Sequence, residues 1–174
     1  MSVQFDSIKE FGLQLRQAQS KMSRATEETI MAICYDIVVE ARNLVTAHGT
    51  IRSGVLKNSF HYGSSLSEPE PGVEWDGTLP VRIDNRLRME VYNNAPYAWY
   101  VEYGFRSHFV PGHWEGYIFN YQPHDPEGGI YVSSGMDYVP GRFFLKRALE
   151  TFERHAKSEF NARIVPVLKE TLEL

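Results

Sequence analysis

Three histidines of residues 105–138, together with two carboxylates near them in the sequence, have donor atoms that suit a metal ion. They are His108, His113, His124, Glu115 and Asp125. Imidazole nitrogens and carboxylate oxygens bind divalent metals when rigid elements hold them and neighbouring hydrogen bonds orient them. The stretch is rich in glycine, proline and tyrosine, which favours a loop whose histidines make hydrogen bonds and contact partners. A partner-binding loop is therefore the preferred interpretation of residues 105–138, and no cofactor is expected. A metal- or ligand-binding enzyme built on this loop is the alternative interpretation.

Nucleophilic catalysis and phosphate binding have little support in the sequence. Ser53-Gly54 lacks the leading glycine of a nucleophile elbow, and no strand-turn-helix pattern surrounds it. Gly112, Gly116 and the pair Gly128-Gly129 neither follow a clear strand nor open a helix, as a phosphate-binding loop requires. No catalytic residue is predicted, and the protein is not expected to be an enzyme.

The charge of the chain opposes nucleic-acid binding. The formal net charge is −4, and residues 59–139 hold four arginines, no lysine and eleven Asp or Glu, a local net charge of −7. Arginines interleaved with aromatic residues could suggest a single-stranded nucleic acid site, but their surroundings are acidic. These arginines are Arg82, Arg86, Arg88 and Arg106.

Cys34 is the single cysteine and lies in an apolar stretch. An internal disulfide and a cysteine-based metal site are therefore excluded, and a small buried hydrophobic residue is expected. The first residues lack a basic region followed by an apolar run, and no segment approaches the length that spans a bilayer. We expect a protein made in a cytoplasm-like compartment without a membrane partner.

An apolar stripe at alternating three- and four-residue spacing predicts a helix over residues 6–47. Ser7 and Glu10 have the spacing of a capping box, Phe5 is placed as a staple, and Gly49 supplies the stop. A break between Ser20 and Thr26 stays open. The stripe is expected to pack on the protein's own sheet, with an intermolecular coiled-coil seam as the alternative. It consists of Ile8, Phe11, Leu15, Ala18, Met22, Ala25, Thr29, Ile33, Ile37, Ala41 and Leu44.

Residues 53–60 are predicted to form a short turn or helical piece that leads into a strand. Residues 59–138 are predicted to form the sheet and its loops. Residues 64–80 indicate a polar loop, and the alternation over 81–92, with a turn signal at Asp84-Asn85, indicates a hairpin with one buried face. Residues 105–138 are expected to be a long interaction loop carrying a small hairpin, with strands at 117–119 and 130–132.

Helical spacing returns over residues 140–172. Pro140 is expected to open this helix, and Pro166 to kink or end it near Val165. The predicted fold is a single α+β domain over residues 1–174. A long N-terminal helix and a C-terminal helix pack on one face of a small, mainly antiparallel sheet with long loops.

Three separated pieces of the sequence resemble motifs of one family. Residues 53–60 resemble a small-Gly-x-Leu-x-x-Ser segment that follows the long helix, and residues 97–104 are similar to a Tyr-Ala-x-Tyr-Val-Glu-x-Gly signature. Residues 139–145 look like a Pro-x-x-Phe-Leu start of the last helix. Together they resemble the tail-component family of tailed bacteriophages, whose members are head-tail joining or tail-completion proteins. The motif positions are Gly54, Leu56, Tyr97, Tyr100, Glu102, Gly104, Phe144 and Leu145.

The resemblance implies a structural virion protein, assembled in the host cytoplasm and located in the neck or tail. Its implied partners are copies of itself in a ring, a head connector or stopper, and a tail terminator or tail tube protein. Family members usually connect the second and third pieces by a shorter route, so the long loop supplies the candidate interface. That interface consists of Phe105, Arg106, His108, Trp114, Tyr117 and Tyr131.

Roles for the motif residues follow as hypotheses. Gly54 and Gly104 would permit backbone turns, and Tyr97 and Tyr100 would pack a short helix on the sheet. Glu102 would be a partly buried acid paired with Arg142 or with a backbone amide. The acidic middle segment is expected to line a passage for DNA, where like charge prevents sticking. A prophage-encoded toxin or regulator is a third interpretation.

Overall fold

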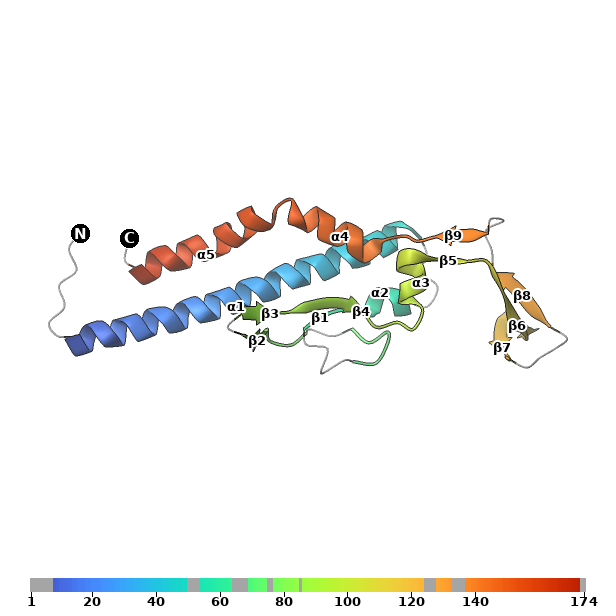
Figure 1. The fold of residues 1–174 in the computed structure, drawn as a ribbon, viewed down its shortest axis with the longest axis horizontal. Coiled ribbons are helices and arrows are strands. Elements are labelled where there is room, and N and C mark those ends of the chain that lie inside the picture. Colours follow the sequence, from blue (N-terminus) through green and yellow to red (C-terminus); the bar gives the residue numbers. More distant parts are fainter. Residues whose placement is uncertain are drawn as a thin grey trace. The chain divides into compact units, whose positions relative to one another are not determined.

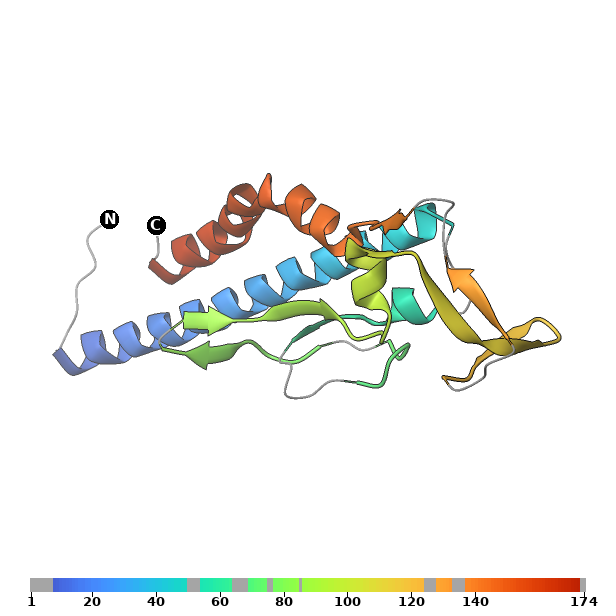
Figure 2. The ribbon, with the colours of Figure 1, turned by 45° about the vertical axis from the view of Figure 1, so that its right-hand side comes forward.

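The computed structural model describes residues 8–49, 54–63, 69–74, 77–84, 86–123, 128–132 and 137–172. The chain forms two compact units (Figures 1 and 2). Unit 1 consists of residues 1–95 and 144–174, and unit 2 consists of residues 96–143. Helices and small antiparallel sheets are both present, so the predicted α+β class is confirmed. The single domain expected over residues 1–174 stays a prediction.

Helix α1 (Ile8–Ala47) is one unbroken helix of 40 residues. The possible break near Thr26 does not occur, and within the continuous helix the hydroxyls of Thr26 and Thr29 donate hydrogen bonds to the carbonyls four residues earlier, at 2.8 and 2.7 Å. The helix ends as predicted, with Gly49 at a φ of 71°. Ser7 and Phe5, the predicted capping residues, lie outside the described residues.

The core of unit 1 covers only the second half of α1. Buried residues begin at Thr29 and continue along that half, whereas Phe11 and Leu15 are 42% and 54% exposed. The prediction that the whole stripe packs on the protein's own sheet is therefore wrong for its first half. An apolar stripe at helical spacing indicates a helix face that packs on another surface, and that surface can belong to the same chain or to a different one. The buried apolar residues are Cys34, Ile37, Val38, Ala41, Val45, Phe60, Tyr62, Ala95, Phe144, Ala148 and Ile164.

Cys34 is buried in this core, as expected. Burial removes water from around the thiolate and raises the pKa of the Cys34 thiol to about 11. The side chain is a small apolar filler there, as its neighbours in the sequence suggest.

A short helix and two strands lie against α1. Helix α2 (Val55–Asn58) leads into β1 (Phe60–Gly63), as predicted, and β1 pairs antiparallel with β4 (Glu90–Asn93). All four residues of β1 are buried, because α1 covers one face of this pair and the segment after β1 covers part of the other.

The predicted hairpin is present, but its buried face is not. Strands β2 (Val81–Ile83) and β3 (Arg86–Arg88) pair antiparallel, with Ile83 opposite Arg86 and Val81 opposite Arg88. Residues opposite each other share a face, so Val81 and Ile83 lie on the arginine face, away from Leu87. Both are exposed, which corrects the expectation that the apolar residues of the two strands would share one buried face.

The C-terminal region forms two helices instead of one. Helix α4 (Phe144–Glu153) and helix α5 (Ala156–Leu172) both contact α1 (Figure 1). The break lies at His155: its N–H donates to Phe152 O, which closes α4, and its own carbonyl accepts bonds from Ser158 and Glu159, which begins α5.

The prediction for Pro140 is wrong, and of the prediction that Pro166 kinks or ends the helix only the ending is wrong, while the kink stays a prediction. Pro140 does not open the helix, because it lies in a strand and pairs with Gly104. Pro166 does not end the helix near Val165, because α5 continues through it to Leu172.

The described residues of unit 2 form α3 (Ala98–Tyr103) and five strands. Strand β5 (Gly104–Arg106) pairs with β9 (Tyr138–Pro140). A second sheet has the order β7-β6-β8, with β6 (His108–Glu115), β7 (Ile118–Tyr121) and β8 (Gly129–Val132). The two predicted strands exist, but β6 lies between them, so the small hairpin of those two strands is wrong. Proline and glycine at positions 111 and 112 disguise β6 in the sequence.

Candidate interaction surfaces

The first family-like segment holds the sheet of unit 1 together through buried polar contacts. Ser59 is fully buried, and its hydroxyl accepts a hydrogen bond from Gly72 N at 2.8 Å. Asn93 Nδ2 donates to Leu56 O at 2.8 Å, and Asn94 N donates to Ser59 O at 3.1 Å. Buried polar groups need such partners, so this segment has a structural role.

Arg42 connects α1 to the same region. Its side chain is 12% exposed and donates to Glu74 Oε1 at 2.7 Å and to Phe60 O at 3.0 Å. One guanidinium therefore links the long helix, strand β1 and the loop after it.

The two motif glycines adopt left-handed backbone conformations. Gly54 has a φ of 77° and precedes α2, and Gly104 has a φ of 84° and follows α3. A Cβ on Gly104 would collide with Val139 O and lie 2.6 Å from Gly141 N. Both positions therefore need a residue without a side chain.

The second and third family-like pieces meet within unit 2. Arg142 N donates to Val101 O at 2.8 Å, and Phe143 N donates to Glu102 O at 3.1 Å. Backbone amides thus bond to the backbone carbonyls of α3, and the role predicted for the Glu102 carboxylate stays a prediction.

The remaining motif positions are divided between the units. Phe144 is fully buried and Leu145 half-buried in unit 1, where the Phe144 ring meets the His48 ring edge-on at 5.8 Å. Tyr97 and Tyr100 are 41% and 54% exposed in unit 2, and their expected role in packing the short helix on the sheet stays a prediction. The Tyr100 ring lies edge-on to Phe105, with centroids 6.1 Å apart.

Unit 2 has almost no core of its own. Among its described residues only Gly112 is buried, and large aromatic side chains lie on the outside. We call these residues the aromatic surface. They are Trp99, Tyr100, Tyr103, Phe109, Trp114, Tyr117, Tyr121, Tyr131 and Tyr138. Exposed aromatic groups of this number are typical of a surface that another protein covers.

The predicted interface residues lie on both faces of the three-stranded sheet. Tyr131 is 75% exposed, and its ring packs 5.4 Å from that of Phe109 on one face. Trp114 is five positions after Phe109 in β6 and therefore lies on the other face, 5.3 Å from Phe119. Tyr117, at the turn between β6 and β7, is wholly exposed.

The other predicted interface residues lie at the end of β5 and the start of β6. Phe105 is half-buried between the rings of Tyr100 and His108, and Arg106 and His108 are exposed. Trp99 and Tyr103 were not predicted as interface residues, although their ring centroids lie 4.3 Å apart and both side chains are exposed on α3. Their spacing of four residues in an aromatic segment was the signal.

The histidines do not form a metal site among the described residues. His108 and His113 lie on opposite faces of β6, because they are five residues apart in one strand. His113 Nε2 is 3.4 Å from Glu115 Oε1, and His108 Nδ1 is 2.9 Å from Arg106 O. His124 and Asp125 are outside the described residues, within which no group of three or more possible ligands is arranged around one point.

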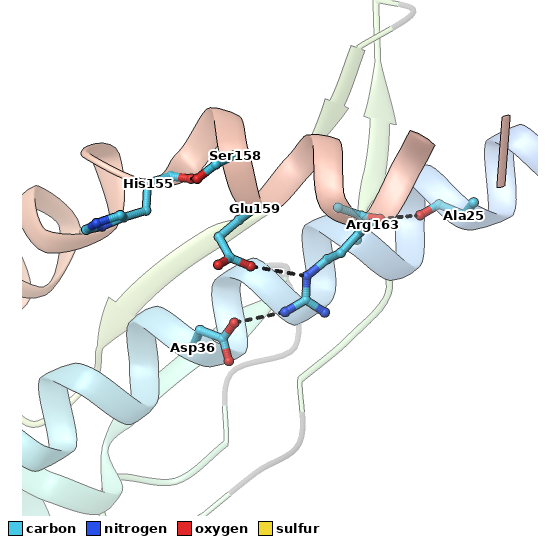
Figure 3. Close-up of polar contacts among 7 residues, drawn as sticks. Ala25, Asp36, His155, Ser158, Glu159 and Arg163 are labelled. Atoms are coloured by element: carbon cyan, nitrogen blue, oxygen red, sulfur yellow. Dashed lines mark hydrogen bonds and ion pairs between the residues drawn. The ribbon is translucent and has the colours of Figure 1, made fainter. Parts of the chain in front are cut away.

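Polar groups also gather in a groove of about 460 Å³ between α1, α4 and α5. Arg163 of α5 lies there between two carboxylates, 3.3 Å from Asp36 of α1 and 3.9 Å from Glu159 (Figure 3). Glu40 lines the same groove beside Ile37. The groove has an acidic rim and an apolar floor, which suits a binding surface better than a reaction site.

Comparison with known proteins gives one match. The sequence model of the family described as "Bacteriophage HK97-gp10, putative tail-component" matches residues 13–104, slightly more than half of the chain. That range contains the first two family-like pieces. No curated protein and no solved structure matches the chain. None of the helices in the described ranges is long and apolar enough to cross a membrane.

Proposed function

Since the chain belongs to the bacteriophage HK97-gp10-like family of tail components, we propose that it joins head and tail as a neck or tail-completion protein. It is a structural protein of the virion and acts by binding other subunits. Its proposed partners are further copies of the same chain in a ring, the head connector or stopper, and the tail terminator or tail tube.

The aromatic surface of unit 2 is the observation that supports this proposal best. A small sheet needs a covered face to be stable in water, and this unit buries only Gly112 among its described residues. Trp, Tyr and Phe are enriched at protein interfaces, because each buries a large apolar area, and Trp and Tyr also keep a polar group that can form a hydrogen bond. A neighbouring subunit would provide the missing cover.

The DNA passage gives the acidic middle segment a role within the same proposal. Residues 59–139 carry a net charge of −7, and like charge would keep DNA from adhering as it passes. Reversing several of these acidic charges should slow DNA ejection. An unchanged ejection rate would remove this role and leave the joining role intact.

Removal of the protein from the phage that encodes it tests the joining role. Electron microscopy should then reveal full heads and finished tails that are separate from one another. Infectious particles that lack the protein would contradict the proposal.

Complementation with variants tests the surface itself. The double variant Trp114→Ser with Tyr131→Ser should fold, because both side chains are exposed. The number of joined particles should fall roughly tenfold or more below that obtained with the unmodified protein, as expected when interface anchors are lost. Leu79→Ser is the matched control, since Leu79 is 67% exposed but lies in unit 1. Normal joining with the double variant would show that the aromatic surface is not an interface.

A further inference from the structure

The β2–β3 hairpin carries an exposed face that is both apolar and cationic. We call it the hairpin face, and it consists of Val81, Ile83, Arg86 and Arg88. Within the described part of the chain, Arg86 and Arg88 form no ion pair. Two β-strand aliphatic side chains and two uncompensated guanidinium groups are thus presented together.

The hairpin is attached loosely to its own α1. An open space of about 690 Å³ lies between the two, lined by Met22 and Ile30 of α1 and by Leu87 and Arg86 of the hairpin, so the exposed Arg86 borders both this space and the hairpin face. Arg82 donates to Ser23 Oγ at 3.3 Å across it. An isolated two-stranded ribbon is only marginally stable in water, so a second surface that covers this hairpin would increase its stability.

The groove between α1, α4 and α5 has the complementary character. Three carboxylates, those of Asp36, Glu40 and Glu159, face a single arginine, Arg163, which gives a net charge of −2. Arg163 is already held between Asp36 and Glu159, and Glu40 forms no ion pair with any described residue. Phe152 supplies partly exposed apolar surface between these charges, and Ile37 and Ala148, which are nearly buried, line the groove beside it.

We propose that the hairpin face of one copy docks into the α1–α4–α5 groove of the next copy. This contact would join neighbouring copies in the proposed ring, and the inference rests on that proposed function. Val81 and Ile83 would cover the apolar floor, and Arg86 and Arg88 would meet Glu40 and the acidic rim. Opposite charges at such a contact fix the register and suppress wrong partners. A volume of about 460 Å³ is sufficient for several side chains.

The contact is directional, which is the property that a ring requires. The hairpin and the α4–α5 pair lie on different sides of α1, so a copy does not fill its own groove (Figures 1 and 2). Two different patches then join neighbouring copies head to tail, and such an interface closes into a ring when the rotation between copies permits.

A charge swap tests the pairing. Arg86→Glu with Arg88→Glu reverses the hairpin face, and Glu40→Lys with Glu159→Lys reverses the groove. Each double variant alone should self-associate roughly tenfold or more weakly in sedimentation velocity, and mixing the two should restore association. Arg16→Glu with Lys169→Glu is the matched control, because these exposed basic residues lie outside both patches. Failure of the mixture to associate better than either variant alone would overturn the pairing.

Cross-linking gives a second readout that does not depend on the charge variants folding. A chain with Ile83→Cys and Thr151→Cys, in a Cys34→Ser background, should form a ladder of disulfide-linked oligomers in purified protein and in particles. Each single-cysteine chain should form no ladder. Absence of the ladder in both preparations would overturn the proposal. The deletion experiment distinguishes the two proposals. If no ladder forms but the phage without the protein yields separate heads and tails, the joining role stands and only this contact is wrong.

Discussion

Two adjacent phenylalanines at the start of the last helical region give a sharp test of the fold. Phe144 is 1% exposed in the core of unit 1, whereas Phe143 is 36% exposed. Truncating a buried phenylalanine to alanine removes its apolar area and leaves a cavity, which costs about 3–5 kcal/mol. Phe144→Ala should therefore lower the free energy of unfolding by about 4 kcal/mol, and the melting temperature by roughly 8–16 °C for a chain of this length.

Phe143→Ala is the control for the same change of side chain. Phe143 has a φ of 53°, and alanine there keeps the same backbone constraint, so the strain cancels in the comparison. The variant loses one edge-on ring contact with Tyr103 at 6.3 Å, which is worth about 1 kcal/mol. Urea unfolding followed by circular dichroism at the helix band reports on unit 1, which contains Phe144 and the three long helices. Phe143 belongs to unit 2, so its truncation should leave this transition almost unchanged. Values within about 1 kcal/mol of each other would refute the placement of Phe144 in the core.

Three further predictions follow from single residues. Gly104→Ala should destabilise unit 2, because at a φ of 84° its Cβ would collide with Val139 O. Backbone amides of β5 and β9 should then lose protection from hydrogen exchange, and unchanged protection would contradict the close approach. Arg42→Met should cost about 2–3 kcal/mol in urea unfolding, whereas Arg24→Met, on an exposed helical pair, should cost less than about 1 kcal/mol. Cys34 should react with thiol reagents at pH 8 roughly 100-fold more slowly than in the unfolded chain, since its pKa is raised from 9.0 to about 11 and less thiolate is present; equal rates would place it outside the core.

The helices could be predicted from the sequence because their signals are local. The stripe of α1 and the stop at Gly49 appear in the residue spacing, and both are present in the structure. The α2–β1 segment was predicted for the same reason. The break at His155 was missed, because a hydrogen bond from His155 N to Phe152 O ends α4 in a sequence that still has helical spacing.

The strands of unit 2 were harder to predict because pairing joins residues that are far apart in the chain. Strand β6 contains proline and glycine, which argue against a strand in isolation. It exists because β7 and β8 supply hydrogen bonds on its two sides. The candidate interface was identified from its aromatic content, yet its division between two faces depends on a register that the sequence does not reveal.

By itself, the sequence determined the α+β class, the long helix, the family and the aromatic character of residues 105–138. The tertiary structure alone decided which apolar residues are covered: the second half of the α1 stripe is buried, while Phe11, Val81 and Ile83 are exposed. The physical reason is that periodicity fixes which side chains share a face, a property of the backbone between near neighbours. Burial of that face depends on which distant segment reaches it, or on a second copy.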